Sequence, residues 1–375
     1  RRASAGVRGW ETFFMTRALA FVASLGVFVA ALGVVVPAAP AVALPPGTKV
    51  QMYQGGLSFP VDMAWVAGTK KIFFTEKNTG KVRVMVGRRL LGRACVDIPV
   101  ASDGEQGALG ITLHPRFQRT KWLYVMYTNA SPEEMRVTRY TVKRNRCGRA
   151  KRIMANVPAS SGYHNGGQLE FVGGKLFIST GENHNAGAAQ SKTNRLGKIL
   201  RYNADGSVPA TNPFSIPGNR NPVWSYGHRN PFGLAHKPGT SKLYETENGP
   251  GCDDELNLIK KGRNYGWGEN YESGGYCGTA GVGDNPKGPL KRWTPPIVPT
   301  DPWWYRGRMG ALSGSLYMGD FEGNLHRFVM NARGTRVRDD RIIHSTDSIV
   351  DVSKGPGGWL YFLTPSSIQR IVPSN

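Results

Sequence analysis

The sequence predicts an all-β fold, and more specifically a six-bladed β-propeller, from three observations. The chain of 375 residues contains 48 glycines and 25 prolines, which is high for a helical protein. After the N-terminus, no long stretch shows the 3.6-residue apolar period of a helix. Short apolar and aromatic segments instead recur at a spacing of roughly 45 to 75 residues, the size of a propeller blade. Since large propellers fold as one unit at this length, we expect a single domain.

Six short segments define this repeat. They are Ile72–Phe74, Leu123–Val125, Leu176–Ile178, Leu243–Tyr244, Leu316–Met318 and Leu360–Phe362. Most are followed by a polar turn and a second strand of alternating pattern: Val82–Val84, Val137–Tyr140, Ile199–Arg201, Leu325–Phe328 and Ile368–Ile371. The alternation puts arginines on one face and aliphatic residues on the other, which predicts outer, half-exposed strands. Six repeats predict six blades.

The N-terminus has the pattern of an export signal. A positively charged start at Met15–Arg17 precedes an uncharged apolar run over residues 18–36, and Ala41–Ala43 matches a signal-peptidase site. We therefore predict a signal peptide over residues 1–43, with residues 1–14 as an upstream extension, and one propeller domain over residues 44–375. An uncleaved membrane anchor is the alternative, because the apolar run is long enough to span a bilayer. With cleavage, the protein is expected to be secreted, periplasmic or held in the cell envelope.

The four cysteines are an even set in a chain predicted to enter an oxidising compartment. Two disulfides are therefore expected, and the favoured pairing is Cys252 with Cys277 and Cys95 with Cys147, because the first two are close in sequence within glycine-rich loops. No CxxC spacing suggests zinc. The chain is also strongly basic, with a net charge of +22. Such a charge is consistent with a solvated surface or with binding to anionic cell-wall polymer or lipid headgroups, and it gives little support for nucleic acid.

Two segments concentrate polar residues between glycines and prolines: Gly227–Leu234 (GHRNPFGL) and Glu247–Ile259 (ENGPGCDDELNLI). Regular elements do not persist in such composition, which is typical of loops that hold a ligand. A propeller brings loops from every blade to the mouth of its central channel, so motifs that are distant in sequence meet there.

Several motifs of this kind occur in a fixed order. They are Gly104–Ile111 with His114–Phe117, Tyr163–Leu169, Gly227–Pro231 and Asn248–Asn257. In this order they resemble the soluble glucose/sorbosone dehydrogenases, from roughly Val50 to the C-terminus. The resemblance implies a six-bladed propeller that oxidises aldose sugars with pyrroloquinoline quinone (PQQ) and calcium. Hedgehog-interacting proteins carry a related domain without established dehydrogenase activity.

The resemblance makes His164 the catalytic base. Sugar oxidation removes the C1 hydroxyl proton while hydride leaves C1, so it needs a base with a pKa near ambient pH, and imidazole fits. The alternative is a histidine that only hydrogen-bonds its own turn. By the same resemblance, Arg229 contacts the quinone oxygens, whose developing negative charge a guanidinium stabilises, and Asn230 contacts a neighbouring polar group. Alternatively, Arg229 pairs with Asp253 or Asp254 to hold two loops together.

For the metal, the main-chain oxygens of Gly249 and Pro250 would suit calcium, which accepts backbone ligands. Asn248 stands where the family usually has a glutamine that contacts cofactor or metal-bound water. The acidic residues 253–255 are expected to brace this loop rather than to ligate the metal. Gln106, by resemblance, reaches toward the substrate.

Aromatic residues offer a further candidate for substrate binding. Trp293, together with Trp303, Trp304 and Tyr305, could stack on a sugar face, although aromatic residues in propeller strands are more often packed between blades. No carboxylate cluster that would converge on the central channel is apparent apart from residues 253–255, which argues against calcium-dependent lactone hydrolysis.

The chain also departs from the family. A lysine and an Arg-x-Arg that would neutralise the cofactor's carboxylates are replaced by Phe321, Ser348 and Val350. A tricarboxylate without such cations meets a heavy desolvation cost. Arg306 and Arg308 are candidate substitutes. Two functions are therefore kept: an exported PQQ- and calcium-dependent aldose dehydrogenase, and a non-catalytic carbohydrate or cell-wall binding propeller that has lost the cofactor.

Overall fold

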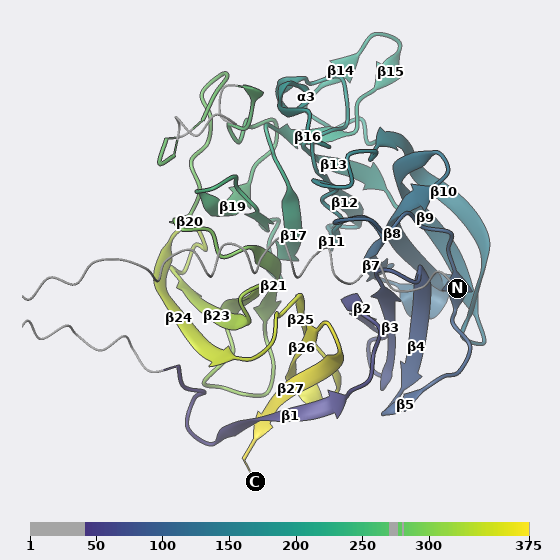
Figure 1. Ribbon diagram of the computed structural model, residues 1–375, viewed down its shortest axis with the longest axis vertical. Helices are drawn as coiled ribbons and strands as arrows, with labels where there is room; N and C mark the ends of the chain where they lie inside the picture. The colour runs from purple at the N-terminus through teal and green to yellow at the C-terminus, as the bar shows by residue number, and fades with distance from the viewer. Residues whose placement is uncertain (1–41, 270–276, 280, 375) are drawn as a thin grey trace, which may run out of the picture. The chain divides into compact units, whose positions relative to one another are not determined.

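The computed structural model describes residues 42–269, 277–279 and 281–374. These residues form the six-bladed β-propeller that the sequence predicts, and Figure 1 shows the six blades following one another around a common centre. The predicted signal peptide lies outside the described residues, apart from its last two positions. Within the part of the chain that is described, no helix combines the length and the apolar character needed to cross a membrane.

Each blade is an antiparallel sheet whose first strand lies nearest the centre. The first blade contains β2 (Pro60–Trp65), β3 (Lys71–Glu76), β4 (Lys81–Val86), β5 (Arg89–Leu90) and β6 (Val96–Asp97). The second contains β7 (Ala108–Leu113), β8 (Trp122–Ala130), β9 (Glu133–Lys143) and β10 (Arg146–Pro158). The third contains β11 (Leu169–Val172), β12 (Lys175–Thr180), β13 (Lys198–Asn203) and β16 (Val223–Tyr226).

The remaining three blades complete the ring. The fourth contains β17 (Pro231–His236), β18 (Leu243–Glu247), β19 (Asp254–Ile259) and β20 (Lys291–Trp293). The fifth contains β21 (Pro299–Tyr305), β22 (Ser315–Asp320), β23 (Asn324–Met330) and β24 (Val337–Ser345). The sixth contains β25 (Asp351–Lys354), β26 (Leu360–Thr364) and β27 (Ser367–Pro373), and β1 (Thr48–Gln54) from the other end of the domain is its outermost strand.

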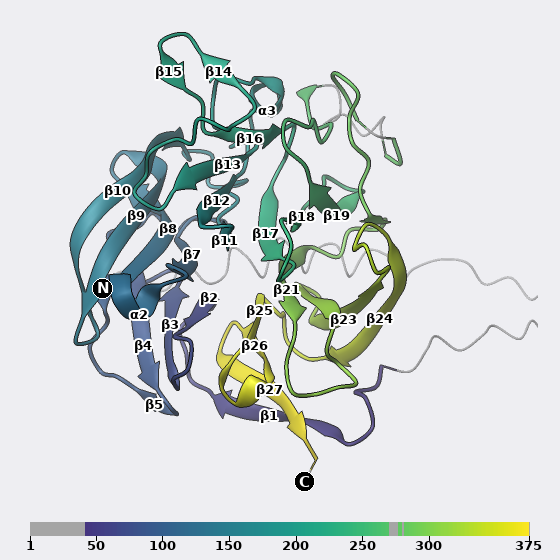
Figure 2. The same cartoon turned by 180° about the vertical axis from the view of Figure 1, so that it is seen from behind.

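Short helical elements and one small hairpin lie in the connections between the strands. They are α2 (Phe117–Thr120), α3 (Ala186–Gln190), the 3₁₀ turn η2 (Pro356–Gly358) and the hairpin β14 (Ser215–Ile216) with β15 (Asn219–Arg220). Figure 2 shows the ring from behind, with α2 in the connection between β7 and β8.

The six apolar-aromatic segments of the sequence are the second strands of the six blades, and they are buried: for example, Phe73, Tyr124 and Tyr317 have no exposed surface. The alternating segments are the third strands rather than the outermost ones. The prediction of their position was wrong because a fourth strand, often separated by a long loop, covers their outer edge. Apolar clusters fill the space between each pair of neighbouring blades.

Hydrogen bonds from one first strand to the next hold the centre of the ring together. Asp351 on β25 accepts from the backbone N–H of Met63 on β2 (3.0 Å), and Asp62 on β2 accepts from that of Ile111 on β7 (2.6 Å). Asp301 on β21 accepts from the N–H of Leu234 on β17 (2.9 Å). Buried backbone groups need such partners, because neighbouring first strands do not pair as a sheet.

These three carboxyl groups overturn one sequence prediction. Asp62, Asp301 and Asp351 each offer an oxygen within 4.8 Å of the others, so a carboxylate cluster does converge on the central channel. The sequence hides it, because each strand contributes only one acidic residue. Burial raises the pKa of Asp62 to about 7, and burial together with the neighbouring carboxyls raises the pKa values of Asp301 and Asp351 well above their usual range.

The cluster predicts that stability falls as the pH rises. In the unfolded chain Asp62 ionises near pH 4, whereas in the fold it keeps its proton up to about pH 7, so the unfolded state binds fewer protons between these values. Raising the pH from 5 to 8 should therefore lower the melting temperature. Asp62→Asn keeps an acceptor for Ile111 and should flatten this decline, while Asp347→Asn, at an exposed position, should not. Calorimetry across this pH range checks it; equal slopes for the three proteins would contradict it.

Candidate functional site

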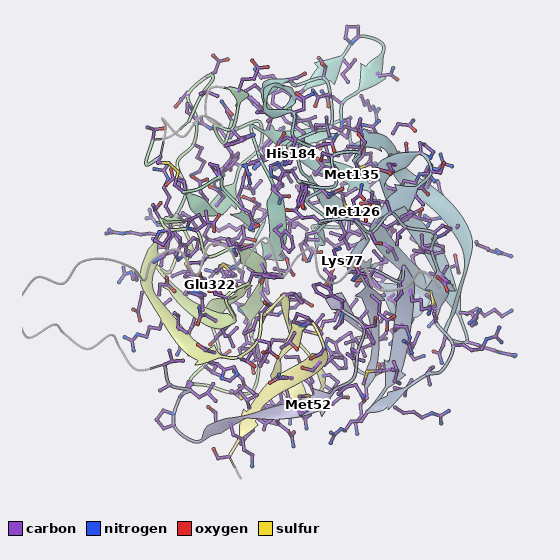
Figure 3. All side chains as sticks on the ribbon, viewed as in Figure 1. Met52, Lys77, Met126, Met135, His184 and Glu322 are labelled. Atoms are coloured by element: carbon purple, nitrogen blue, oxygen red, sulfur yellow. A yellow bond between two sulfur atoms is a disulfide. The ribbon has the colours of Figure 1, made fainter. Side chains whose placement is uncertain are left out.

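One end of the ring gathers nearly all of the predicted site residues. In each blade the connection to the first strand and the turn between the second and third strands lie at the same end, because the strands alternate in direction. The loops before β7, β11 and β17 and the turns after β12 and β18 therefore share one mouth. Figure 3 labels three side chains from such turns, namely Lys77, His184 and Glu322.

His164 lies in this mouth in an unusual backbone conformation. Its φ is 52°, in the left-handed region, and its side chain is buried. The backbone N–H donates to Glu105 Oε2 (2.8 Å), and Nδ1 is hydrogen-bonded to Glu182 Oε1. With Nδ1 occupied, Nε2 is the ring nitrogen left for chemistry.

Burial shifts the protonation of this pair toward neutral forms. The pKa of His164 falls to about 3, first because of burial and second because of the positive charge of Arg229. The pKa of Glu182 rises to about 7, again chiefly because of burial. At neutral pH the imidazole is therefore uncharged. Its pKa lies below the near-ambient value expected from the sequence, so proton uptake by the ring depends on the ionised form of Glu182, whose pKa of about 7 puts it near its midpoint.

Arg229 is held beside this pair from several sides. Its carbonyl oxygen accepts from the N–H of Glu182 (2.9 Å), its own N–H donates to Glu247, and its Nη1 donates to the carbonyl of Asn248 (2.9 Å). The guanidinium lies 5.3 Å from the ring centre of Trp267, a cation–π contact. No ion pair between Arg229 and Asp253 or Asp254 is present among the described residues.

Asn230 and Glu105 connect two loops. Asn230 Oδ1 accepts from the N–H of Gly166 (3.0 Å), and its Nδ2 donates to Glu105 Oε2 (3.0 Å). The same Glu105 oxygen accepts from His164. Glu105 thus fixes His164 relative to Asn230, a role that the sequence reading missed.

The turn at residues 248–250 follows β18 and lies next to Arg229. Gly249 donates its N–H to Asp254 Oδ1 (2.7 Å), and a Cβ there would lie 2.2 Å from the carbonyl oxygen of Cys252. Only glycine fits this close approach. A small cavity of about 20 Å³ lies here, with room for one water or ion. It is lined by Arg229, Gly249 and Pro250, by the acidic residues Glu247, Asp253 and Glu255, and by residues 265–267.

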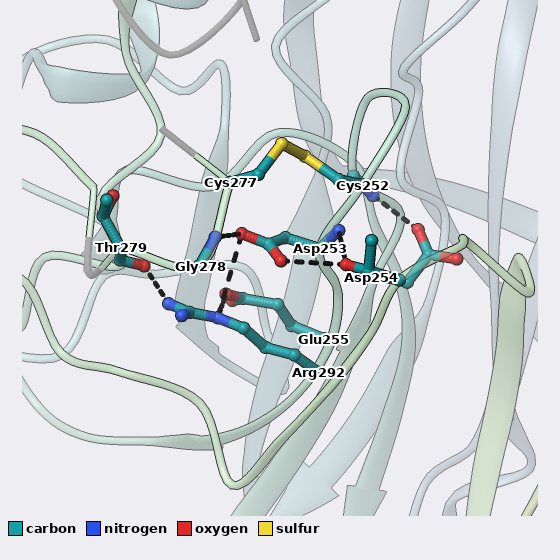
Figure 4. Close-up of a disulfide and its surroundings, with 10 residues drawn as sticks. Cys252, Asp253, Asp254, Glu255, Cys277, Gly278, Thr279 and Arg292 are labelled. Carbon is teal, nitrogen blue, oxygen red and sulfur yellow. Dashed lines mark hydrogen bonds and ion pairs between the residues drawn. A yellow bond between two sulfur atoms is a disulfide. The ribbon is translucent and has the colours of Figure 1, made fainter. Parts of the chain in front are cut away.

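The acidic residues brace the loop, as predicted. Asp254 Oδ2 accepts from the N–H groups of Ile297 and Val298 (both 2.7 Å), in addition to the bond from Gly249. Figure 4 shows the neighbouring disulfide, Cys252–Cys277, with Asp253 bonded to the N–H of Gly278. The second disulfide is Cys95–Cys147, so both predicted pairings are confirmed.

Two residues predicted to contact the substrate, Gln106 and Trp293, are engaged in other contacts. Gln106 is buried and donates from Nε2 to the carbonyl of Ala159 (2.7 Å), so it is its neighbour Glu105 that faces His164. Trp293 ends the outermost strand of the fourth blade and packs edge-on against His326 and Phe328 of the fifth, with ring centres 6.2 and 6.0 Å apart.

The other aromatic and basic candidates lie in different surroundings. Trp304 and Tyr305 are buried between blades. Arg306 and Arg308 follow β21, in a connection at the opposite end of the ring, so they cannot replace the missing cations. That opposite end also opens into a cavity of about 920 Å³, which none of His164, Arg229 and Asn248 lines.

The three positions that lack family cations serve the packing. Ser348 Oγ donates to the carbonyl of Phe321 (2.7 Å), Phe321 packs against an apolar cluster between the sixth and first blades, and Val350 is buried in that cluster. These residues bring no positive charge to the mouth.

A buried cluster that the sequence reading missed supports the Arg229 loop. His228 Nδ1 is bonded to Glu247 Oε2 (2.9 Å), and the His228 ring stacks on Tyr265. Glu245, on the same strand as Glu247, is fully buried, and neither of its carboxyl oxygens has a partner among the described residues. His228, Glu245 and Glu247 offer ligand atoms within 4.8 Å of one another, a set that could hold a metal. In the sequence these acids look like ordinary strand residues.

Unpartnered polar atoms gather around the mouth. They are Nε of Arg229, Oδ1 of Asn248, Oε2 of Glu182 and Nδ2 of Asn165, all buried and without a hydrogen bond to any described residue. Buried polar groups without partners are costly, so their concentration here fits a bound polar molecule that has both donors and acceptors. A quinone with carbonyl and carboxyl oxygens is chemically suited to the Arg229 side.

Known proteins share this architecture. The family model for glucose/sorbosone dehydrogenase matches residues 57–372. The aldose sugar dehydrogenase YliI of Escherichia coli is 30% identical over 356 residues, which covers 89% of this chain and 95% of that protein. The soluble aldose sugar dehydrogenase of E. coli in its apo form superposes with a TM-score of 0.78 at 27% identity, covering 87% of this chain and 99% of the other.

A relative with bound cofactor is also similar. The PQQ-bound aldose sugar dehydrogenase of Streptomyces coelicolor superposes with a TM-score of 0.74 at 26% identity, covering 88% of this chain and 99% of the other. The family match over residues 57–372 includes every loop that contributes to the mouth. The chain therefore belongs to the glucose/sorbosone dehydrogenase family.

Proposed function

We propose that this protein is an exported oxidoreductase that oxidises the C1 hydroxyl of aldose sugars and passes the hydride to PQQ. Membership of the family supports sugar oxidation in general. The observation that carries the finer proposal is the buried His164–Glu182 pair, fixed next to Arg229 by backbone hydrogen bonds.

His164 is the general base. Glu182 holds Nδ1, so the lone pair of Nε2 takes the proton of the C1 hydroxyl as hydride leaves C1. Glu105 fixes the backbone of His164 and so sets the position of the ring. A base held in this way needs little reorganisation when the proton is transferred.

The loops around Arg229 would hold the cofactor. Arg229, Asn230, Asn248 and Gly249 are the residues proposed to contact the quinone, and the carbonyl oxygens of Gly249 and Pro250 to ligate calcium. When bound, the quinone supplies the hydride acceptor and calcium supplies a Lewis acid. The Arg229 guanidinium stabilises negative charge that develops nearby, an effect that burial strengthens.

The sugar is proposed to contact an exposed pair of rings beside the base. Tyr163 is 39% exposed and stacks on His184, with ring centres 5.7 Å apart and planes 12° apart. His184 in turn lies edge-to-face with His164 at 4.2 Å. Aromatic rings offer an apolar face with a polar tip, which suits a sugar, whereas Trp293 and Gln106 are engaged in packing.

A non-catalytic carbohydrate or cell-wall binding protein is the second candidate. It is favoured by one observation, the uncharged residues at positions 321, 348 and 350 where the family supplies cations. The ring pair at Tyr163 serves either function. The high net charge supports contact with an anionic cell-wall or membrane surface in both cases.

Reconstitution separates the two candidates. Purified protein is mixed with PQQ and calcium, and the reduction of a dye is followed with a panel of aldoses. We expect turnover, together with quenching of tryptophan fluorescence as the cofactor is titrated. No turnover and no response to the cofactor, with sugar binding intact, would leave the binding protein as the better description.

Replacing the base tests its role. His164→Asn should lower kcat by about 10²-fold or more, because a general base contributes 10² to 10⁴, while the cofactor titration stays unchanged. Asparagine is chosen because it tolerates the left-handed backbone at this position. His236→Asn, at the far end of β17, is the matched control and should keep normal turnover. Normal kcat in His164→Asn would assign the base to another group.

The acid limb of the pH profile should report Glu182. Above pH 7 its carboxylate accepts the Nδ1 proton and leaves Nε2 free; below it, protonated Glu182 donates to Nδ1 and the ring carries its proton on Nε2. We therefore expect kcat/KM of the reconstituted enzyme to rise through about pH 7. Glu182→Gln should remove this limb and lower activity roughly 10²- to 10⁴-fold, as loss of the correct tautomer does elsewhere. The control is Glu170→Gln on β11, which removes another glutamate whose pKa burial raises, to about 8, and this variant should keep the limb. An acid limb that survives in Glu182→Gln would exclude the His164–Glu182 pairing.

A further inference from the structure

The outer edge of the second blade carries an unusual density of positive charge. The hairpin of β9 and β10 exposes six basic side chains within ten residues: Lys143, Arg144, Arg146, Arg149, Lys151 and Arg152. We call this set the basic rim. Because β10 is the outermost strand of its sheet, these side chains face solvent rather than another blade.

The charges of the basic rim are not neutralised within the protein. None of the six residues takes part in an ion pair with any other described residue. Arg146 donates Nη1 to the carbonyl of Ala94 (2.6 Å), which carries no net charge. Asp205 is a nearby acid, and its carboxyl is bonded to Ser207; the charge of Lys151 helps to lower its pKa, but the two residues form no ion pair.

A disulfide makes the basic rim rigid and extends it. Cys147, inside the hairpin, is bonded to Cys95, and the N–H of Cys147 donates to the carbonyl of Cys95 (2.9 Å). This link places exposed Arg93 of the first blade next to the hairpin. A surface that is already ordered loses less conformational entropy when it binds a ligand.

A groove continues the basic rim onto the third blade. A cavity of about 530 Å³ lies beside β10 and is lined by Arg152, Arg195 and Arg220 together with uncharged polar and apolar residues. Arg195 donates to the carbonyl of Asn156 (3.4 Å), and Arg220 donates to the carbonyl of Val208 (3.2 Å). Three guanidinium groups around one groove, without a carboxylate partner, attract an anion that can accept several hydrogen bonds.

The location and chemistry of the surface favour one kind of partner. The strand from Arg146 to Arg152 alone spans about 20 Å, long enough to meet several phosphates in succession. Insertion into a membrane requires exposed apolar side chains next to the charges, and the large exposed apolar residues among those described, Val42, Met52, Val86, Tyr163 and Val329, all lie outside the basic rim. The turn of the hairpin lies at the end of the ring opposite His164, and none of His164, Glu182 and Arg229 lines the groove, so an occupant would leave these side chains free.

From these observations we propose that the basic rim and its groove bind a linear, phosphate-bearing polymer. The interaction is electrostatic, with arginine forks on the phosphate oxygens, and it anchors the propeller by its edge. It does not depend on the proposed dehydrogenase activity, since none of His164, Glu182 and Arg229 lines the groove.

Sodium polyphosphate is a suitable probe, because it offers the phosphate chemistry without a lipid or a sugar. Titrations by fluorescence anisotropy at several salt concentrations compare the protein with the triple variant Arg149→Gln, Lys151→Gln, Arg152→Gln, which leaves the disulfide and Arg146 in place. We expect binding at least tenfold weaker, and a plot of log affinity against log salt whose slope is smaller by about 2, as three lost phosphate contacts imply. The matched control is Arg333→Gln, Arg336→Gln, Arg338→Gln, which removes the same charge from an exposed hairpin of the fifth blade and should bind within twofold of the unchanged protein.

Four results would overturn the proposal. Equal losses in both triple variants would show that only net charge matters, and no loss in either would place the site elsewhere. Binding to phosphatidylglycerol vesicles without binding to polyphosphate would assign the surface to a membrane. If the first variant keeps its affinity but self-associates in sedimentation experiments, the charges protect an edge strand instead. Unchanged melting temperatures and PQQ titrations in both variants establish that the fold and the mouth are intact.

Discussion

The hydrogen bonds that join one first strand to the next are the constraint on which the rest of this propeller depends. The first strands do not pair as a sheet, so Asp62, Asp301 and Asp351 satisfy backbone N–H groups across the gaps between blades. Next to Asp301, the hydroxyl of Thr300 donates to the carbonyl of Ile349, which precedes the first strand of the next blade (2.6 Å). Each of these bonds requires a polar group to be buried, which costs free energy. In return, the bond fixes the angle between neighbouring blades.

That angle positions the mouth. His164, Arg229 and Asn248 come from loops of the third and fourth blades, and they meet only because these blades are held at a fixed separation. Three glutamates then fix the loops relative to one another. Glu105 joins the His164 loop to Asn230. Glu182 binds both His164 and the backbone of Arg229, and Glu247 accepts from the N–H of Arg229. Buried carboxyls therefore do more to shape this site than its cations do, and they leave it rich in oxygen atoms that a cation can bind. A metal ion or a cationic side chain has a clear electrostatic reason to be retained there.

Much of the fold could be predicted from local patterns, because the second strand of every blade is buried on both faces and reads as an apolar-aromatic run. The Cys252–Cys277 pairing followed from sequence proximity, and Cys95–Cys147 was the pair that remained. The direction in which individual side chains point was harder to predict. Gln106 and Glu105 are adjacent in a turn between Gly104 (φ 51°) and Gly107 (φ 148°), and only the folded backbone decides which one faces His164. Glu245 and Glu247 look like solvent-facing strand residues until the fourth blade is packed against its neighbours. Trp293 was misplaced because nothing local distinguishes an aromatic residue of a loop from one that ends an outer strand.

The sixth blade combines the two ends of the domain, since β1 pairs with β27 from Thr48↔Pro373 onward and Arg370 reaches across to Gln51. A ring closed in this way cannot be completed before β27 has been synthesised: β1 precedes all other strands of the domain and must wait for the last of them. Until then β1 remains an unpaired strand, and the apolar cluster between the sixth and first blades has only one side. Proteolytic trimming at either terminus that passes Thr48 or Pro373 would reopen the circle, so the tolerance for cuts near the ends is set by a handful of residues.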